Sequence, residues 1–171
     1  MLTEKMENAL NAHINAELYS AYMYYAMSAH FAAEGLPGCS HWMNLQVVEE
    51  LDHAHRFIDY VNERGGRVKL AAIDAPQLEW ESPLAVFSNA LAHEQHVTSL
   101  INTLVDVAIA ESDHATNNFL QWFVGEQVEE EASAGEIVDK MELVADDKGG
   151  LFFLDQELGK RALTNPPTFG A

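Results

Sequence analysis

The chain has little cysteine and little positive charge. Cys39 is the only cysteine among 171 residues, so an intrachain disulfide and a zinc or iron–sulfur site built from several cysteines are excluded. Only 9 Lys and Arg residues stand against 27 Asp and Glu residues, for a net charge of -18. Because phosphate binding needs clusters of basic residues, this balance argues against nucleic acid as a partner. It fits a protein that attracts cations, or one with a very soluble surface.

Long apolar runs are also missing. No window approaches the ~18 uncharged apolar residues of a membrane span, and residues 1–7 contain no apolar signal-peptide segment. With its single cysteine, the sequence therefore predicts a protein of a reducing compartment, the cytoplasm, with no membrane partner. Hydrophobic residues make up 48% of the chain, which is enough for a folded core. The length predicts one domain over residues 1–171.

The apolar pattern is helical almost throughout. Thr3 is a candidate N-cap, Gly35 is a stop signal, and Ser82 followed by Pro83 is a strong start signal. The predicted helices cover residues 3–33, 37–65, 82–111, 113–145 and, as a short fifth helix, 151–162. The fold class is therefore all-α.

The lengths of the connections predict the topology. The first and second helices, and the third and fourth, are joined by short segments, so each pair should be antiparallel. The segment 67–81 is long: its fifteen residues can span about 50 Å, and a helix of about 28 residues is roughly 42 Å long. This segment can therefore cross the bundle, which predicts a four-helix bundle with one long crossover. The short fifth helix should cap one end or contact another subunit.

Each long helix carries potential metal ligands near its middle, where the core of a bundle should be apolar. Burying carboxylates there is costly unless a cation neutralises them. The residues that stand in these motifs are Glu17, Glu49, Glu50, His53, Glu94, Glu126, Gln127, Glu129 and Glu130. One carboxylate from each of two helices with Glu-x-x-His on another follows the pattern of di-iron bundles. The fourth helix departs from that pattern, because it has no second Glu-x-x-His.

The charges fit a pair of metal ions. Glu17, Glu50, Glu94 and Glu130 balance the charge of two ferrous ions, and two ferric ions with a bridging oxide would be neutral as well. Oxygen ligands with few imidazoles and no thiolate favour iron or manganese over copper, and zinc could compete. Without metal, mutual repulsion should leave some of these carboxylates protonated.

Several nearby residues have two interpretations. Tyr24 lies seven residues after Glu17 and shares its helix face, so it is either a core aromatic residue or a hydrogen-bonding or redox partner of the metals. Trp122 is expected to pack rather than to donate electrons. Five histidines are predicted to lie on the surface: His13, His30, His41, His55 and His114.

These motifs resemble those of the ferritins, and of the non-haem prokaryotic ferritins in particular, over nearly the whole chain. The matching stretches are Asn15 to Ser20, Glu49 to His53, His93-Glu94, and Asn118 to Glu131, with Glu63 to Val68 also similar. Bacterioferritins place a haem-ligating methionine directly after the glutamate of the second helix. Here Leu51 follows Glu50, so no haem is expected.

The resemblance implies a ferroxidase that oxidises Fe(II) with dioxygen or hydrogen peroxide and stores ferric oxyhydroxide in a cage of about 24 copies. Glu17, Glu50 and His53 would bind the first iron. Glu94, Glu130 and a bridging Glu50 would bind the second, with Gln127 close by, and Tyr24 would be the tyrosine of the site. Glu49, Glu126, Glu129 and Glu130 would form a third iron site. Two alternatives stay open: a metal-independent structural or interaction bundle, and a di-metal oxidase of another substrate.

Overall fold

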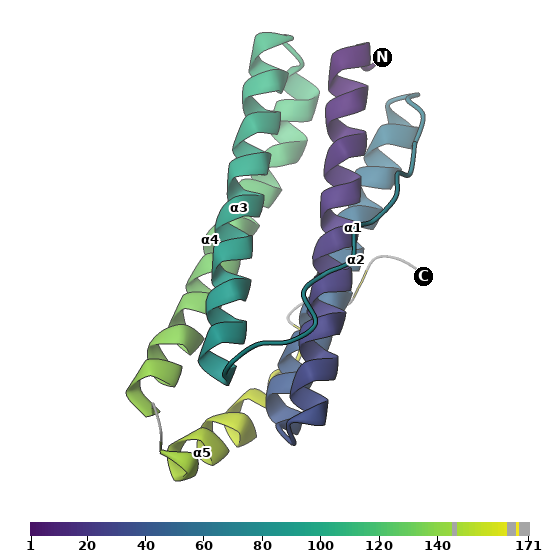
Figure 1. The fold of residues 1–171 in the computed structure, drawn as a ribbon. Coiled ribbons are helices and arrows are strands. Elements are labelled where there is room, and N and C mark those ends of the chain that lie inside the picture. The colour runs from purple at the N-terminus through teal and green to yellow at the C-terminus, as the bar shows by residue number, and fades with distance from the viewer. Residues whose placement is uncertain (145–146, 164–166, 168–171) are drawn as a thin grey trace.

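The computed structural model describes residues 1–144, 147–163 and 167, and these residues contain helices and no strands (Figure 1). The helices are α1 (Glu4–Ala33), α2 (Pro37–Glu63), α3 (Pro83–Ala110), α4 (His114–Val144) and α5 (Lys148–Leu158). The all-α fold class is thereby confirmed. The predicted end of the fourth helix, Ala145, lies outside the described residues. No helix in the described ranges is long and apolar enough to cross a membrane.

The helix ends follow the capping signals in the sequence. Thr3 Oγ1 accepts a hydrogen bond from Met6 N at 3.2 Å, and Ser82 Oγ accepts one from Ala85 N at 3.1 Å. Both side chains satisfy backbone donors that the first helical turn leaves free. Gly35 follows α1 with φ 76, a left-handed conformation that costs glycine least.

The long helices form two antiparallel pairs, α1 with α2 and α3 with α4 (Figure 1). Residues 64–82 run along α1 from one end of the bundle to the other, so α2 and α3 are parallel, as predicted. Asn11 fixes this crossover: its Nδ2 donates to Arg67 O at 3.0 Å and its Oδ1 accepts from Lys69 N at 2.5 Å. Lys69 also pairs with Glu7 at 2.8 Å.

The fifth helix begins earlier and ends earlier than the predicted range 151–162. Asp147 is its N-cap and accepts a hydrogen bond from Gly149 N at 2.9 Å, so Gly149 and Gly150 form its first turn instead of preceding it. The helix lies across one end of the bundle and contacts α2 and α4 (Figure 1). It therefore caps that end, as expected.

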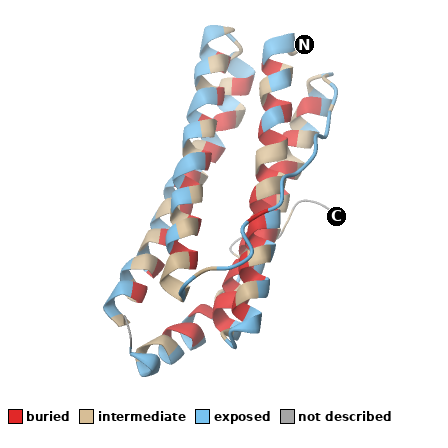
Figure 2. Cartoon of the chain, in the orientation of Figure 1, coloured by how far each residue is buried: buried red, intermediate tan, exposed pale blue. Residues whose placement is uncertain are grey.

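The interior contains two apolar clusters with buried polar residues between them. Figure 2 shows that buried residues line the facing sides of the helices. The cluster near α5 includes Phe31, Trp42 and Phe87, and the cluster at the other end includes Phe57 and Ile101. In each long helix a buried glutamate stands between residues of the two clusters: Glu17 in α1, Glu50 in α2, Glu94 in α3 and Glu130 in α4. The predicted matching depth of the four carboxylates is therefore present.

Candidate metal centre

Four carboxylates lie buried at the middle of the bundle. Glu17, Glu50 and Glu94 are each 1% exposed and Glu130 is 7% exposed. His53 follows Glu50 by three residues, so helical spacing places both on the same face of α2. His53 is 3% exposed. A layer with this much negative charge is unfavourable inside a bundle unless protons or cations neutralise it.

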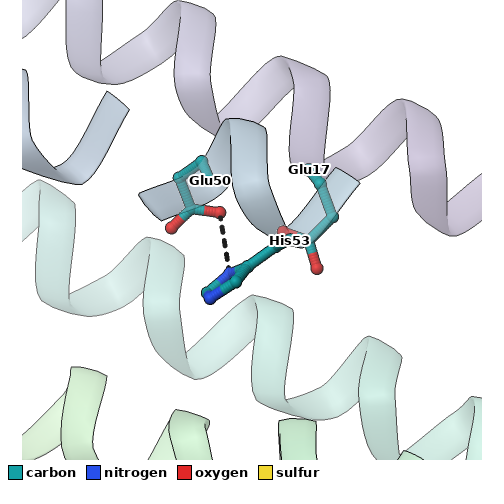
Figure 3. Close-up of side chains that lie close together, drawn as sticks. All are labelled: Glu17, Glu50 and His53. Carbon is teal, nitrogen blue, oxygen red and sulfur yellow. Dashed lines mark ion pairs between the residues drawn. The ribbon is translucent and has the colours of Figure 1, made fainter. Parts of the chain in front are cut away.

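Glu17, Glu50 and His53 form a tight group of potential ligands (Figure 3). One atom from each residue lies within 4.8 Å of the others, and His53 Nδ1 is 3.7 Å from Glu50 Oε2. Among the described residues, Glu17 Oε2, Glu50 Oε2 and His53 Nδ1 have no hydrogen-bond partner. Each such buried atom costs free energy, and a cation between them would remove that cost. Two carboxylates and an imidazole suit iron, manganese or zinc.

The pKa values of the two carboxylates of this group shift in opposite directions. Burial, with repulsion from Glu94 and Glu17, raises the pKa of Glu50 well above its usual value. Burial would raise the pKa of Glu17 too, but the charge and hydrogen bond of His13, with the charge of His53, lower it to about 2. Without metal, the environment therefore favours the ionised form of Glu17 and the protonated form of Glu50, which reduces the repulsion between these neighbours.

The surface position expected for His13 is wrong. His13 is 3% exposed, and its Nε2 donates to Glu17 Oε1 at 2.7 Å. Its ring also packs against Phe57, with 4.6 Å between the ring centroids. Sequence reasoning missed this partner of Glu17, although the i, i+4 spacing of the two residues on one helix face was a usable signal. Among the other four histidines of that prediction, His114 is exposed and His30, His41 and His55 are partly buried.

Glu94 lies at the same level but is held by other partners. Tyr24 donates its hydroxyl proton to Glu94 Oε1, and Gln127 Nε2 lies 3.3 Å from Glu94 Oε2. Burial, with the charge of Glu130, raises the pKa of Glu94 to about 8. Within the described residues Glu94 joins no tight ligand group. In the predicted two-iron centre, the ligands of the first iron are therefore close together, whereas Glu94, predicted for the second iron, is not grouped with other ligands. Tyr24 is a hydrogen-bonding partner of the carboxylate layer as well as a core residue.

A second tight group joins α2 and α4. His53, Glu126 and Glu130 each offer an atom within 4.8 Å of the others. This group lies in a pocket whose lining also includes Glu49 and Glu129, so all four acids of the predicted third site face one pocket. Burial, with repulsion from neighbouring carboxylates, raises the pKa of Glu126. Glu49 and Glu129 stay outside the tight group.

Trp122 lines the same pocket and is 38% exposed. Its ring centroid is 5.5 Å from that of His53, and the guanidinium of Arg56 lies 4.2 Å from the ring centre. The packing role expected for Trp122 agrees with these contacts.

Comparison with known proteins gives one consistent result. A family model described as a Ferritin-like domain matches residues 7–144. The bacterial non-heme ferritin of Bacteroides fragilis is 47% identical over 161 residues, which cover 94% of this chain and 100% of that protein. The bacterial non-heme ferritin of Campylobacter jejuni is 39% identical over 164 residues, covering 96% of this chain and 98% of that protein.

Solved structures agree with these relatives. The structure described as a novel open pore ferritin from the hyperthermophilic archaeon Archaeoglobus fulgidus has 54% sequence identity and a TM-score of 0.94, and the alignment covers 95% of this chain and 100% of that chain. An engineered closed form of the same ferritin has the same TM-score of 0.94. Sequence, fold and family match coincide over nearly the full length, so the chain belongs to the ferritin family.

Proposed function

We propose that this protein is an iron-storage ferritin that oxidises Fe(II) within each bundle and stores the product as a ferric oxyhydroxide mineral. The observation that carries the proposal is the set of three buried potential ligand atoms that have no hydrogen-bond partner, on Glu17, Glu50 and His53. A bundle with only a structural role would gain stability from apolar residues at these positions. The names of the bacterial relatives support the same function.

The residues have distinct proposed roles. Glu17, Glu50 and His53 bind the first Fe(II), and Glu94, Glu130 and a bridging Glu50 bind the second. Tyr24 and Gln127 hold Glu94 by hydrogen bonds, which fixes its carboxylate. Glu49, Glu126 and Glu129, with the shared Glu130, bind a third iron in the pocket between α2 and α4.

The oxidation balances with either oxidant. Two Fe(II) ions give up one electron each, and dioxygen takes both electrons with two protons and leaves as hydrogen peroxide. If hydrogen peroxide is the oxidant, the same two electrons and two protons give two molecules of water. The four carboxylates neutralise two ferrous ions, so the ions enter the buried layer without leaving net charge there.

The assembly belongs to the same proposal. One ferritin-like domain per chain, over residues 1–171, would form a closed homo-oligomeric cage of about 24 copies, with a cytoplasmic location. The mineral would then be enclosed and kept in solution.

The test is aerobic addition of Fe(II) to the purified metal-free protein, with ferric absorbance and particle size followed together. We expect rapid oxidation, with many irons per chain held in a large soluble particle. Glu50→Ala should abolish fast oxidation and leave the particle size unchanged, because it removes a ligand of both irons. Glu142→Ala, at an exposed glutamate of α4, is the matched control.

Other outcomes would favour the alternatives. Oxidation no faster than in buffer, with a small oligomer, would point to a structural or interaction bundle. Fast turnover of an organic substrate without mineral would point to a di-metal oxidase. Full-rate iron oxidation by Glu50→Ala would reject the assigned centre.

A further inference from the structure

An arginine from the segment after α5 reaches into the acidic pocket between α2 and α4. The Nη2 atom of Arg161 lies 2.7 Å from Glu49 Oε2, and its Nη1 donates to Gln46 Oε1. The guanidinium stacks over Trp42, 4.6 Å from the ring centre. His41 holds the backbone of the same residue, with Nε2 at 2.9 Å from Arg161 O. Glu49, Gln46 and Trp42 contact the guanidinium, and His41 contacts the backbone. These contacts hold the Arg161 side chain in one position, unlike an isolated surface ion pair.

Gln46 links Arg161 to the buried carboxylates through hydrogen bonds to both. Gln46 is completely buried, at 0% exposure, and its Nε2 donates to Glu130 Oε2 at 2.8 Å. An arginine can only donate hydrogen bonds, so the amide oxygen of Gln46 must face Arg161 and the amide nitrogen must face Glu130. Arg161 therefore occupies an oxygen of Glu49 directly and, through Gln46, keeps an oxygen of Glu130 occupied.

The other arginine of the pocket does not share this role. Arg56 Nε pairs with Asp52 at 2.7 Å, and its guanidinium stacks on Trp122. Glu49 and Glu130 are two of the four acids to which the proposed function assigns the third iron. Glu49 and Glu129 both stay outside the tight ligand group, and Glu49 is the one of the two that Arg161 holds.

We propose that Arg161 is the built-in counter-cation of the third iron site and competes with iron for Glu49, an inference that rests on the proposed function. Iron can use Glu49 Oε2 only when the guanidinium leaves, and Glu130 Oε2 only when Gln46 turns. The Arg161 side chain is 21% exposed and follows the end of α5, so it can move into solvent without unfolding a helix. The third iron is therefore bound more weakly than the first two, and it leaves its site more readily.

The test measures metal binding and not oxidation. Metal-free wild-type protein and Arg161→Ala are titrated with Fe(II) without oxygen, and with redox-inactive Zn²⁺, by calorimetry. Arg161→Ala should leave the two tight ions per chain unchanged and tighten the third by about tenfold, the scale of one charge-assisted hydrogen-bonded pair. Arg161→Lys keeps the charge but loses the forked geometry, so it should give a smaller increase.

Matched variants locate the effect. Lys160→Ala removes an exposed positive charge from the neighbouring position and should change nothing. In a Glu49→Gln background, Arg161→Ala should tighten the third ion less, because only the contact through Gln46 to Glu130 is then removed. Light scattering on each variant checks that the particle size is unchanged.

The failures are distinguishable. Two tight ions with an unchanged third ion in Arg161→Ala would overturn this inference and leave the proposed function standing. Weakening of all three ions would also overturn it, because Arg161 would then only support the structure. Wild-type protein that binds no tight ions would overturn the proposed function, and the inference with it.

Discussion

At the scale of single residues, the ionised state of Glu17 depends on His13. The hydrogen bond between them is 2.7 Å long, and both side chains are buried. The second oxygen of Glu17 has no partner among the described residues and is thus left for a metal. His13 therefore orients a carboxylate of the proposed first iron site without being a ligand itself.

Replacing His13 by Ala should destabilise the metal-free protein by about 1–3 kcal/mol, because a buried carboxylate loses its hydrogen-bond partner. The same change should weaken binding of the first ion, here measured as Zn²⁺, by roughly tenfold or more. Denaturant unfolding and calorimetry provide the two measurements, and His114→Ala is the exposed control. Unchanged stability and unchanged affinity would show that Glu17 does not need this partner.

Glu94 should make the stability of the metal-free protein depend on pH. Burial, with repulsion from Glu130, raises its pKa to about 8. A carboxyl whose pKa is raised in the folded state stabilises the fold fully below its unfolded pKa, and this stabilisation is lost as the pH rises through the folded pKa. Between about pH 4.5 and about pH 8, this one group should lower the free energy of unfolding by up to about 1.4 kcal/mol per pH unit.

Unfolding midpoints measured in chelator across this pH window test the prediction. Glu94→Gln removes the titrating group and keeps an acceptor for the Tyr24 hydroxyl, so the loss of stability with rising pH should become smaller in this variant. Equal pH slopes for the variant and the wild type would contradict the raised pKa of Glu94.

At the scale of elements, the packing of α5 on α2 depends on a glycine. A Cβ atom on Gly38 would lie 1.7 Å from Asp155 O, and Asp155 Oδ1 accepts a hydrogen bond from Cys39 N at 2.9 Å. The backbones of the two helices are therefore in direct contact. This contact positions α5 and, with it, the segment after α5 that contains Arg161.

Gly38→Ala should force α5 away from α2 and destabilise the protein by about 1–3 kcal/mol or more, as overpacking does. Gly125→Ala is the matched control, because a Cβ there meets nothing within 4 Å. In the interior of α4 that change should stabilise the protein by roughly 0.5–1 kcal/mol. Thermal unfolding of both variants provides the comparison, and equal midpoints would show that α5 is not tightly packed at Gly38.

At the scale of the whole molecule, the net charge of -18 should speed the approach of Fe(II). Screening lengths fall from about 30 Å at 0.01 M salt to about 3 Å at 1 M, so a long-range attraction is lost over this range. We expect the initial rate of Fe(II) oxidation to fall several-fold between these two salt concentrations. Stopped-flow absorbance in sodium chloride, repeated in sodium perchlorate, would distinguish charge screening from chloride binding to iron. A rate independent of salt would mean that the field does not guide uptake.

The sequence by itself determined the features that depend on neighbours along the chain. The side chains of Thr3 and Ser82 cap helices that begin where the local pattern places them. The crossover is long enough to span the bundle, which predicted that α2 and α3 are parallel, and periodicity puts one buried glutamate on each long helix. These features follow from helical geometry, which repeats every few residues.

Tertiary structure decided which groups meet across the bundle. Only the folded chain holds Arg161 against Glu49, 112 residues away in the sequence. Only the folded chain brings the Tyr24 hydroxyl to Glu94 and leaves Glu50 Oε2 without a hydrogen bond among the described residues. The start of α5 at Lys148, by contrast, follows from a local cap by Asp147 and not from a tertiary contact. Contacts between distant residues depend on side-chain packing and on competition for hydrogen bonds, and no periodicity in the sequence encodes either of them.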